Sequence, residues 1–353
     1  MDEYIAFDSH KHYTWVEREQ VASGRLRQFR VEHTPGAIRQ ALAGCAPGTP
    51  VAIEATANWY WITDEIEQAG CRPQLTHPRK AKLMMGQINK TDRLDTHGMN
   101  RLQRNGTLPV VWMPPGPLRD LRELTRTRVV LVAQRTRWKN RITATLAKWG
   151  VPPSEYSDPY GKRARAEWEQ RIAWLPEQTR WTLRQMLEQL DHLNAQVAGF
   201  EQRLKELVEV TPEMQRLMSL PGVGVILAAT IALEVGEVSR FLSAERLASY
   251  AGTVPRVIAS GDRMRFGRTR PDVNRYLKWA FAEAGNSVAV NYRRWPERHV
   301  SQLYVRVRVY KGKGHHKAVG AVARHLAEAA FHLLSRQQEY RDPATAGGRT
   351  REV

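Results

Sequence analysis

Short apolar runs alternate with polar stretches over the first hundred residues. Residues 4–8, 13–16, 50–54 and 74–78 each have the length and composition of a strand. Residues 59–69 have the pattern of a helix that stops at Gly70. Because strands and helices alternate, this region predicts an α/β domain with a mixed or parallel sheet and helices packed on it.

Helical patterns dominate the rest of the chain. Residues 117–149 predict one long helix, which Gly150 closes. Further on, apolar residues recur at heptad spacing, which indicates a coiled-coil seam in the form of an antiparallel hairpin or a dimer. The seam consists of Leu183, Met186, Leu190, Leu193, Val197, Phe200, Leu204 and Leu207. A mostly helical region follows Pro212, and from Gln338 the polar chain is expected to be a mobile tail.

The Pro-Gly-Val-Gly run ending at Gly224 has the pattern of a helix-hairpin-helix turn. In such a turn Gly222 and Gly224 would let a DNA backbone approach, and the next helix would offer its free N–H groups to a phosphate. The alternative interpretation is an ordinary Pro-Gly turn between two packed helices.

Composition and net charge indicate the class of protein and its binding partner. The 353 residues carry a formal net charge of +18, and 42% of them are hydrophobic, which excludes a disordered tail protein. With only Cys45 and Cys71, there is no disulfide framework or cysteine-based metal cluster. No run is long enough to span a membrane, and the acidic start does not resemble a signal peptide. We therefore expect a cytoplasmic, nucleoid-associated protein with a nucleic acid as partner.

The positive charge is confined to two blocks. Residues 1–100 hold 12 basic and 12 acidic side chains, whereas residues 101–150 hold 11 and 2, and residues 256–317 hold 15 and 4. In the first block Arg119, Arg122 and Arg126 are candidates for phosphate contacts, with a merely solvated helix face as the alternative.

Four carboxylates are candidates for a metal site in the neutral first hundred residues. Asp8 and Glu54 each end a predicted strand, so both can project from one edge of the sheet. Asp92 and Asp95 are three residues apart, on one face if a helix begins near Thr91. Four converging carboxylates suit two Mg²⁺ or Mn²⁺ ions that act on a phosphodiester. The alternative is that these residues cap turns and helix N-termini.

Ser260 is a candidate nucleophile in a basic loop. A serine that attacks a phosphodiester conserves the bond energy in a phosphoserine linkage, and nearby cations can clamp the phosphate. These cations are Arg263, Arg265, Arg268, Arg270, Arg275 and Lys278. No nearby histidine offers itself as the base.

Together these residues resemble a known family, the insertion-sequence transposases that pair a RuvC-like DEDD domain with a C-terminal serine domain and are guided by a bridge RNA. The resemblance rests on the order of several short motifs, at residues 6–11, 53–56, 90–95, 220–224, 250–255 and 260–261. Lys11 and Lys90 lie in these motifs and are candidate nucleic-acid contacts. The first motif departs from the family at Phe7 and His10, and Thr96 stands where the family usually has alanine.

The resemblance implies the roles of the candidate residues and the assembly. Asp8, Glu54, Asp92 and Asp95 would match the metal-binding tetrad, which takes Mg²⁺ or Mn²⁺, and Ser260 the nucleophile. The partners would be element-end and target DNA, a guide RNA, and further copies of the chain in a dimer or tetramer.

The implied organisation is an RNase H-like domain over residues 1–115, a long basic helix over 116–150 and a coiled-coil segment over 151–211. A helical serine transposase domain would span residues 212–337, before a tail over 338–353. Two other functions use parts of the same pattern. A RuvC-like junction nuclease would hydrolyse DNA with the four carboxylates and need no serine. A non-catalytic architectural protein would need only the helix-hairpin-helix and the basic helix.

Overall fold

A computed structural model describes residues 3–86, 91–261 and 263–343. The chain divides into two compact units, Met1–Pro114 and Pro115–Val353. Each unit has its own hydrophobic core.

The first unit is a five-stranded mixed sheet with helices on both faces. Its strands lie in the order β3-β2-β1-β4-β5. The first three strands pair antiparallel, whereas β4 is parallel to both β1 and β5. The elements are β1 (Glu3–Ser9), β2 (Tyr13–Gln20), β3 (Leu26–Glu32), α1 (Ala37–Ala41), β4 (Pro50–Glu54), α2 (Trp59–Gln68), β5 (Arg72–Thr76), α3 (Pro78–Met85) and α4 (Asp92–Arg104).

The two faces of this sheet differ in side-chain size. On one face, Ile5, Phe7 and Ile53 pack with Ile38 of α1 and Ile62 of α2 in a large apolar core. On the other face, the small residues Ala6 and Ala52 pack against Met99 of α4. Alanine leaves room for a helix to come close to the sheet, so α4 lies over β1 and β2 and also touches β4.

The sequence predicts this unit well except at its edge. Every predicted strand and the helix at residues 59–69 are present, with ends that shift by a few residues. The strand β3 (Leu26–Glu32) was not predicted. It is an edge strand with a largely exposed surface, and its arginines and glutamine interrupt the apolar pattern that marks buried strands.

The second unit is helical apart from one hairpin. Its elements are α5 (Gly116–Lys148), α6 (Lys162–Ala166), α7 (Trp168–Ile172), α8 (Glu177–Leu207), α9 (Pro212–Met218), α10 (Val225–Val235), η1 (Val238–Arg240), α11 (Ala244–Tyr250), β6 (Pro255–Ser260), β7 (Arg263–Thr269), α12 (Arg275–Asn291), α13 (His299–Val305), η2 (Arg306–Tyr310) and α14 (His315–Arg336). Its main core is formed by α10, α11, α12 and α14, with contributions from α9 and α13.

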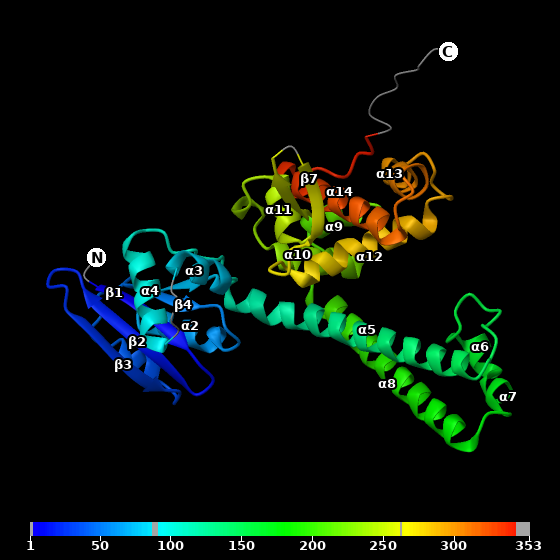
Figure 1. The fold of residues 1–353 in the computed structure, drawn as a ribbon, viewed down its shortest axis with the longest axis horizontal. Helices are drawn as coiled ribbons and strands as arrows, with labels where there is room; N and C mark the ends of the chain where they lie inside the picture. The colour runs from blue at the N-terminus through cyan, green and yellow to red at the C-terminus, as the bar shows by residue number, and fades with distance from the viewer. Residues whose placement is uncertain (1–2, 87–90, 262, 344–353) are drawn as a thin grey trace, which may run out of the picture. The chain divides into compact units, whose positions relative to one another are not determined.

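The predicted heptad seam packs within the chain. Helices α5 and α8 lie side by side (Figure 1). They run antiparallel, because Arg128 contacts Glu201 while Arg135, further along α5, contacts the earlier Asn194 on α8. Six of the eight seam residues are buried, whereas Phe200 is half-buried and Leu207 is exposed. The hairpin interpretation of the seam therefore describes this contact.

The region predicted as a mobile tail begins with an ordered stretch. The backbone N–H of Tyr340 donates to Ser219 Oγ at 2.8 Å, and both carboxylate oxygens of Asp342 accept from the N–H of His299, the first residue of α13. The expectation of a mobile tail from Gln338 is therefore wrong for residues 338–343, and residues 344–353 lie outside the described part. Among the helices of the described residues, none is long and apolar enough to cross a bilayer.

Candidate active site

Two of the candidate carboxylates come from the ends of neighbouring parallel strands. The register pairs Phe7 of β1 with Ile53 of β4, so Asp8 and Glu54 follow at adjacent positions. They continue the face on which Ala6 and Ala52 meet α4, because side chains two residues apart point to the same side of a strand. Asp8 is 6% exposed, and Glu54 is half-buried.

The other two carboxylates stand in the first turn of α4. The Thr91 side chain caps this helix by accepting from the N–H of Leu94, which fixes its start at Asp92. Asp92 and Asp95 therefore lie in the first turn, at the positive end of the helix dipole. Asp92 and Asp8 converge on one histidine: His10 Nε2 is 3.4 Å from Asp8 Oδ2 and 3.3 Å from Asp92 Oδ2.

This group has the chemistry of a metal site. One ligand atom from each of Asp8, His10 and Asp92 lies within 4.8 Å of the others. Oxygen ligands suit Mg²⁺ and Mn²⁺, and an imidazole in the group suits Mn²⁺ better than Mg²⁺. The structure thus brings Asp8 and Asp92 together and places Glu54 and Asp95 beside them along the backbone, on the next strand and on the same helical turn.

His10 and Tyr13 are parts of the site that our sequence analysis did not identify as functional. The Tyr13 hydroxyl donates to Asp92 Oδ2 at 2.9 Å, and this bond raises the pKa of Tyr13 above its ordinary value. The Asn58 side chain donates to the His10 carbonyl at 2.7 Å, which ties the loop after β1 to the loop after β4. The sequence gives no periodic signal for these contacts, because they join loops and strand ends.

A buried glutamate anchors α4 below the site. Glu17 of β2 is fully buried and accepts from Asn100 Nδ2 at 3.0 Å and from Gln28 Nε2 at 2.6 Å. The ring of His97 lies 3.2 Å from the same carboxylate. Since Asn100 and His97 belong to α4, these contacts fix the helix that carries Asp92 and Asp95.

Ser260 lies at the end of a strand and not in an irregular loop. It ends β6 and pairs with Arg263, the first residue of β7, so the expectation of a loop is wrong. Gly261 follows with a φ of 56°, a left-handed conformation that favours glycine in a tight turn. Ser260 is exposed and shares one face of the hairpin with Arg263 and Arg265, because directly paired residues project to the same side.

The other cations near Ser260 have mixed environments. Arg270 forms an ion pair with Asp272 at 2.5 Å, and the ammonium group of Lys278 donates to Thr269 at 2.6 Å. Arg268 and Arg275 are exposed. In the first unit Lys11 is exposed, and Lys90 lies outside the described residues.

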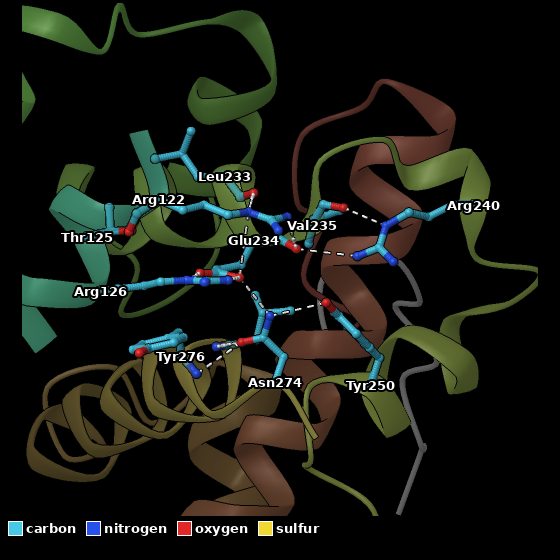
Figure 2. Close-up of polar contacts among 11 residues, drawn as sticks. Arg122, Thr125, Arg126, Leu233, Glu234, Val235, Arg240, Tyr250, Asn274 and Tyr276 are labelled. Atoms are coloured by element: carbon cyan, nitrogen blue, oxygen red, sulfur yellow. Dashed lines mark hydrogen bonds and ion pairs between the residues drawn. The ribbon is translucent and has the colours of Figure 1, made fainter. Parts of the chain in front are cut away.

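Two of the candidate arginines of α5, Arg122 and Arg126, have a structural role. Arg119 and Arg122 are only 6% and 3% exposed. Arg122 donates to the carbonyls of Leu233 and Glu234 at 2.7 and 3.0 Å, and Arg126 donates twice to the fully buried Glu234 carboxylate (Figure 2). The guanidinium groups of Arg122 and Arg126 hold α5 against the end of α10. This geometry argues against our expectation that Arg119, Arg122 and Arg126 contact nucleic acid.

The two glycines of the predicted helix-hairpin-helix turn differ. Gly222 has a φ of 82°, and a Cβ there would lie 2.4 Å from the Ala284 carbonyl oxygen of α12. Internal packing therefore requires Gly222 and supports the alternative interpretation of a turn between packed helices. Gly224 precedes α10, and an added Cβ would meet no atom within 4 Å, so this residue leaves the turn open on its outer side.

Two family models match this chain, each over a different range of residues. Residues 5–149 match a transposase family of the IS110 DEDD type, and residues 214–301 match the Transposase IS116/IS110/IS902 family. The chain belongs to the IS110/IS116 family of insertion-sequence transposases.

Individual relatives are consistent with this assignment. A probable family 20 transposase of Pseudomonas aeruginosa is 24% identical over 80% of this chain and 79% of its own length. The transposase for insertion sequence element IS1111A of Coxiella burnetii is 23% identical over 77% and 74%. A putative transposase, y4qE, of Sinorhizobium fredii is 31% identical over 71% and 63%.

This transposase is thus an enzyme that cuts and rejoins DNA. The DEDD match covers all four carboxylates, Asp8, Glu54, Asp92 and Asp95, and a domain of that type indicates the use of a divalent metal. The second match covers Ser260 and the turn at Gly222.

Proposed function

We propose that this transposase cuts DNA by attack of the Ser260 hydroxyl on a phosphodiester, assisted by a divalent cation at the four carboxylates. The observation that carries the proposal is the convergence of Asp8 and Asp92 on His10, with one ligand atom of each within 4.8 Å of the others. Like charges at this separation repel, so a cation between them relieves the repulsion.

The residues present fit a divalent cation. Asp8, Glu54, Asp92 and Asp95 would hold it, with His10 as a further ligand. When bound, Mg²⁺ or Mn²⁺ would polarise the scissile phosphate as a Lewis acid. The protein's own groups orient the ligands: Tyr13 holds Asp92 through its hydroxyl, and Glu17 holds α4 through His97 and Asn100.

The serine step conserves the phosphodiester energy. The Ser260 Oγ–phosphorus bond forms as the bond from phosphorus to one sugar oxygen breaks, and no atom is oxidised or reduced. The hydroxyl proton passes to water, and the departing sugar oxygen takes a proton from water. Arg263 and Arg265 share the face of the hairpin with Ser260 and would neutralise charge on the phosphate. Rejoining is the same exchange in reverse, with a new sugar hydroxyl as nucleophile.

Sequence choice would come from a guide RNA and not from protein contacts with bases. The proposal of a guide RNA is supported by the family resemblance and by exposed cations such as Arg265, Arg268 and Arg275. Phosphate contacts alone carry no sequence information, so base pairing to the guide would select the target. A dimer or tetramer is likewise part of the proposal.

A trapping experiment tests the serine step. The protein is incubated with Mg²⁺, labelled element-end DNA and co-expressed RNA, and covalent protein–DNA adducts are separated on a denaturing gel. We expect adducts with the wild type and with Ser239→Ala, which removes another exposed serine of the same unit. Ser260→Ala should form none, and an adduct in that variant would exclude Ser260 as the nucleophile.

The same gel separates the two other functions. Nicking without an adduct would favour a junction nuclease that hydrolyses DNA with the four carboxylates. Unchanged adduct formation by Asp8→Asn and Asp95→Asn would remove the carboxylates from the reaction. Binding without any cleavage in Mg²⁺ or Mn²⁺ would favour an architectural protein.

A further inference from the structure

The segment between α13 and α14 has an unusual backbone. Residues Arg306–Tyr310 form a π-helical turn, η2, in which the N–H of Lys311 donates to the Arg306 carbonyl at 3.0 Å. A short loop follows, in which Gly312 has a φ of 57°, and α14 begins at His315. π-helical turns are rare and occur often at functional sites. The segment lies beyond residue 301, where the family match ends.

This segment concentrates positive charge without internal compensation. Its cations are Arg306, Arg308, Lys311, Lys313 and Lys317, all exposed, and residues 306–317 contain no acidic residue. Among the residues that the structure describes, none of these five cations forms an ion pair. By contrast, Arg126, Arg128 and Arg184 of the same unit are all paired with carboxylates. Unpaired like charges repel one another, and a bound polyanion would remove that cost.

The N-terminus of the adjoining helix α14 adds to this uncompensated positive charge. Helix α14 has no side-chain cap and no acidic residue in its first turn, which contains Lys317 instead. Cations are unfavourable at the positive end of a helix dipole. An anion at this surface would offset both the dipole and the cluster of charge.

An exposed aromatic ring stands among these cations. Tyr310 is 81% exposed and its neighbour Val309 is 59% exposed. Stacking of a base on an aromatic ring, beside cations that contact the backbone, is the usual way in which proteins bind unpaired nucleic acid. Bases of a duplex are already stacked on each other and leave no free face for the ring.

We propose that the Tyr310 surface, defined as residues 306–317, binds an unpaired nucleic-acid strand. Tyr310 stacks on a base, and the five cations follow the phosphate backbone. An acidic protein partner would satisfy the charge but would not need the ring. The proposal depends on neither Ser260 nor the carboxylates, so binding and covalent adduct formation test it and the proposed function separately.

The test is equilibrium binding of the full-length protein, without Mg²⁺, to three fluorescein-labelled oligonucleotides of one sequence: unpaired DNA, unpaired RNA and duplex DNA. We expect Tyr310→Ala to weaken binding of the unpaired strand about 5- to 150-fold. Tyr310→Phe keeps the ring and should bind as the wild type does. Because Tyr310 is exposed, both variants should keep the wild-type helix content by circular dichroism.

Salt dependence tests the cations. Arg308→Gln and Lys311→Gln should each lower the slope of log K against log salt by about 0.7 for an unpaired strand. The control Lys205→Gln removes an exposed cation of α8 and should leave both the affinity and the slope almost unchanged. A preference for unpaired RNA or for unpaired DNA would support the proposal and identify the source of the strand.

Three results would overturn it. Tyr310→Ala could bind as tightly as the wild type, which would remove the ring from the contact. Tyr310→Ala could instead weaken duplex and unpaired strands equally, which would exclude stacking on a free base. Finally, Lys205→Gln could change the slope as much as Lys311→Gln, which would make the effect one of total charge.

Discussion

Replacing Glu234 by alanine should destabilise the second unit by about 3–5 kcal/mol, because the change leaves buried arginines without their counter-ion. The Glu234 carboxylate is fully buried. It accepts from Arg126 Nε at 2.6 Å, from Arg126 Nη2 at 3.0 Å and from Asn274 Nδ2 at 2.8 Å, and it lies 3.7 Å from Arg122 Nε (Figure 2).

The magnitude follows from what the alanine variant loses and keeps. Three hydrogen bonds that involve charged groups, at about 1.5–3 kcal/mol each, would sum to about 4.5–9 kcal/mol, which exceeds most of the expected range. Bonds that share a partner are not additive, and Arg126 is 24% exposed and regains some hydration. Arg122 keeps its bonds to the Leu233 and Glu234 carbonyls, but burial already lowers its pKa, so it is left as a poorly compensated charge.

Amide hydrogen exchange on the intact protein measures this effect locally, which matters because a chain of two units need not unfold in one transition. Amide exchange in α10 and α12 should be faster in Glu234→Ala than in the wild type, by the factor that corresponds to a loss of about 3–5 kcal/mol in stability. The matched control is Glu237→Ala, which removes an exposed carboxylate three residues away and should change stability by less than about 0.5 kcal/mol. Equal effects of the two substitutions would refute the role that we give to the buried carboxylate.

Three further predictions follow from the described contacts. Gly222→Ala should cost about 2–5 kcal/mol in a urea titration, since it combines a positive φ with a Cβ 2.4 Å from a carbonyl oxygen, whereas Gly224→Ala should cost less than about 1 kcal/mol. Burial lowers the pKa of His325. The stability that neutral His325 contributes is therefore complete above about pH 6.5 and is lost as the pH falls toward the folded-state pKa. In a pH titration of stability, His325→Gln should show a smaller fall below about pH 6.5 than the wild type. Tyr13→Phe removes the bond to Asp92 and should weaken Mn²⁺ affinity about 10- to 100-fold in a titration, and an unchanged affinity would contradict its orienting role.

Local pattern was sufficient to predict much of the first unit. The strand Pro50–Glu54 has the predicted bounds, and α4 starts one residue after Thr91, because apolar runs and caps act over a few residues. The same logic put Asp8 and Glu54 at one edge of the sheet. The convergence of Asp8, Asp92 and His10 depends on the approach of α4 to the sheet, which no local pattern encodes.

The hairpin of β6 and β7 could not be predicted for a different reason. All of its residues except Pro255 and Thr269 are exposed, so no apolar alternation marks a buried face. Val257 and Phe266 pair on one side while Ser260 and Arg263 pair on the other, and this division is visible only once the register is known. A two-stranded hairpin has little stability of its own in water, so we expect nucleic acid to stabilise it.

The direction in which each arginine points decides what its charge does. The segment at residues 101–150 is one of the two most basic parts of the chain, yet Arg122 and Arg126 use their charge to fix α5 to α10. A helix rich in arginine is therefore not by itself a phosphate-binding surface, because a buried carboxylate such as Glu234 can require the same residues. At the Tyr310 surface five cations are exposed and form no ion pair with any described residue, so an external polyanion is the compensation left to them. Charge reversal at Lys311 should consequently weaken nucleic-acid binding without loss of stability, whereas charge reversal at Arg122 should unfold the second unit.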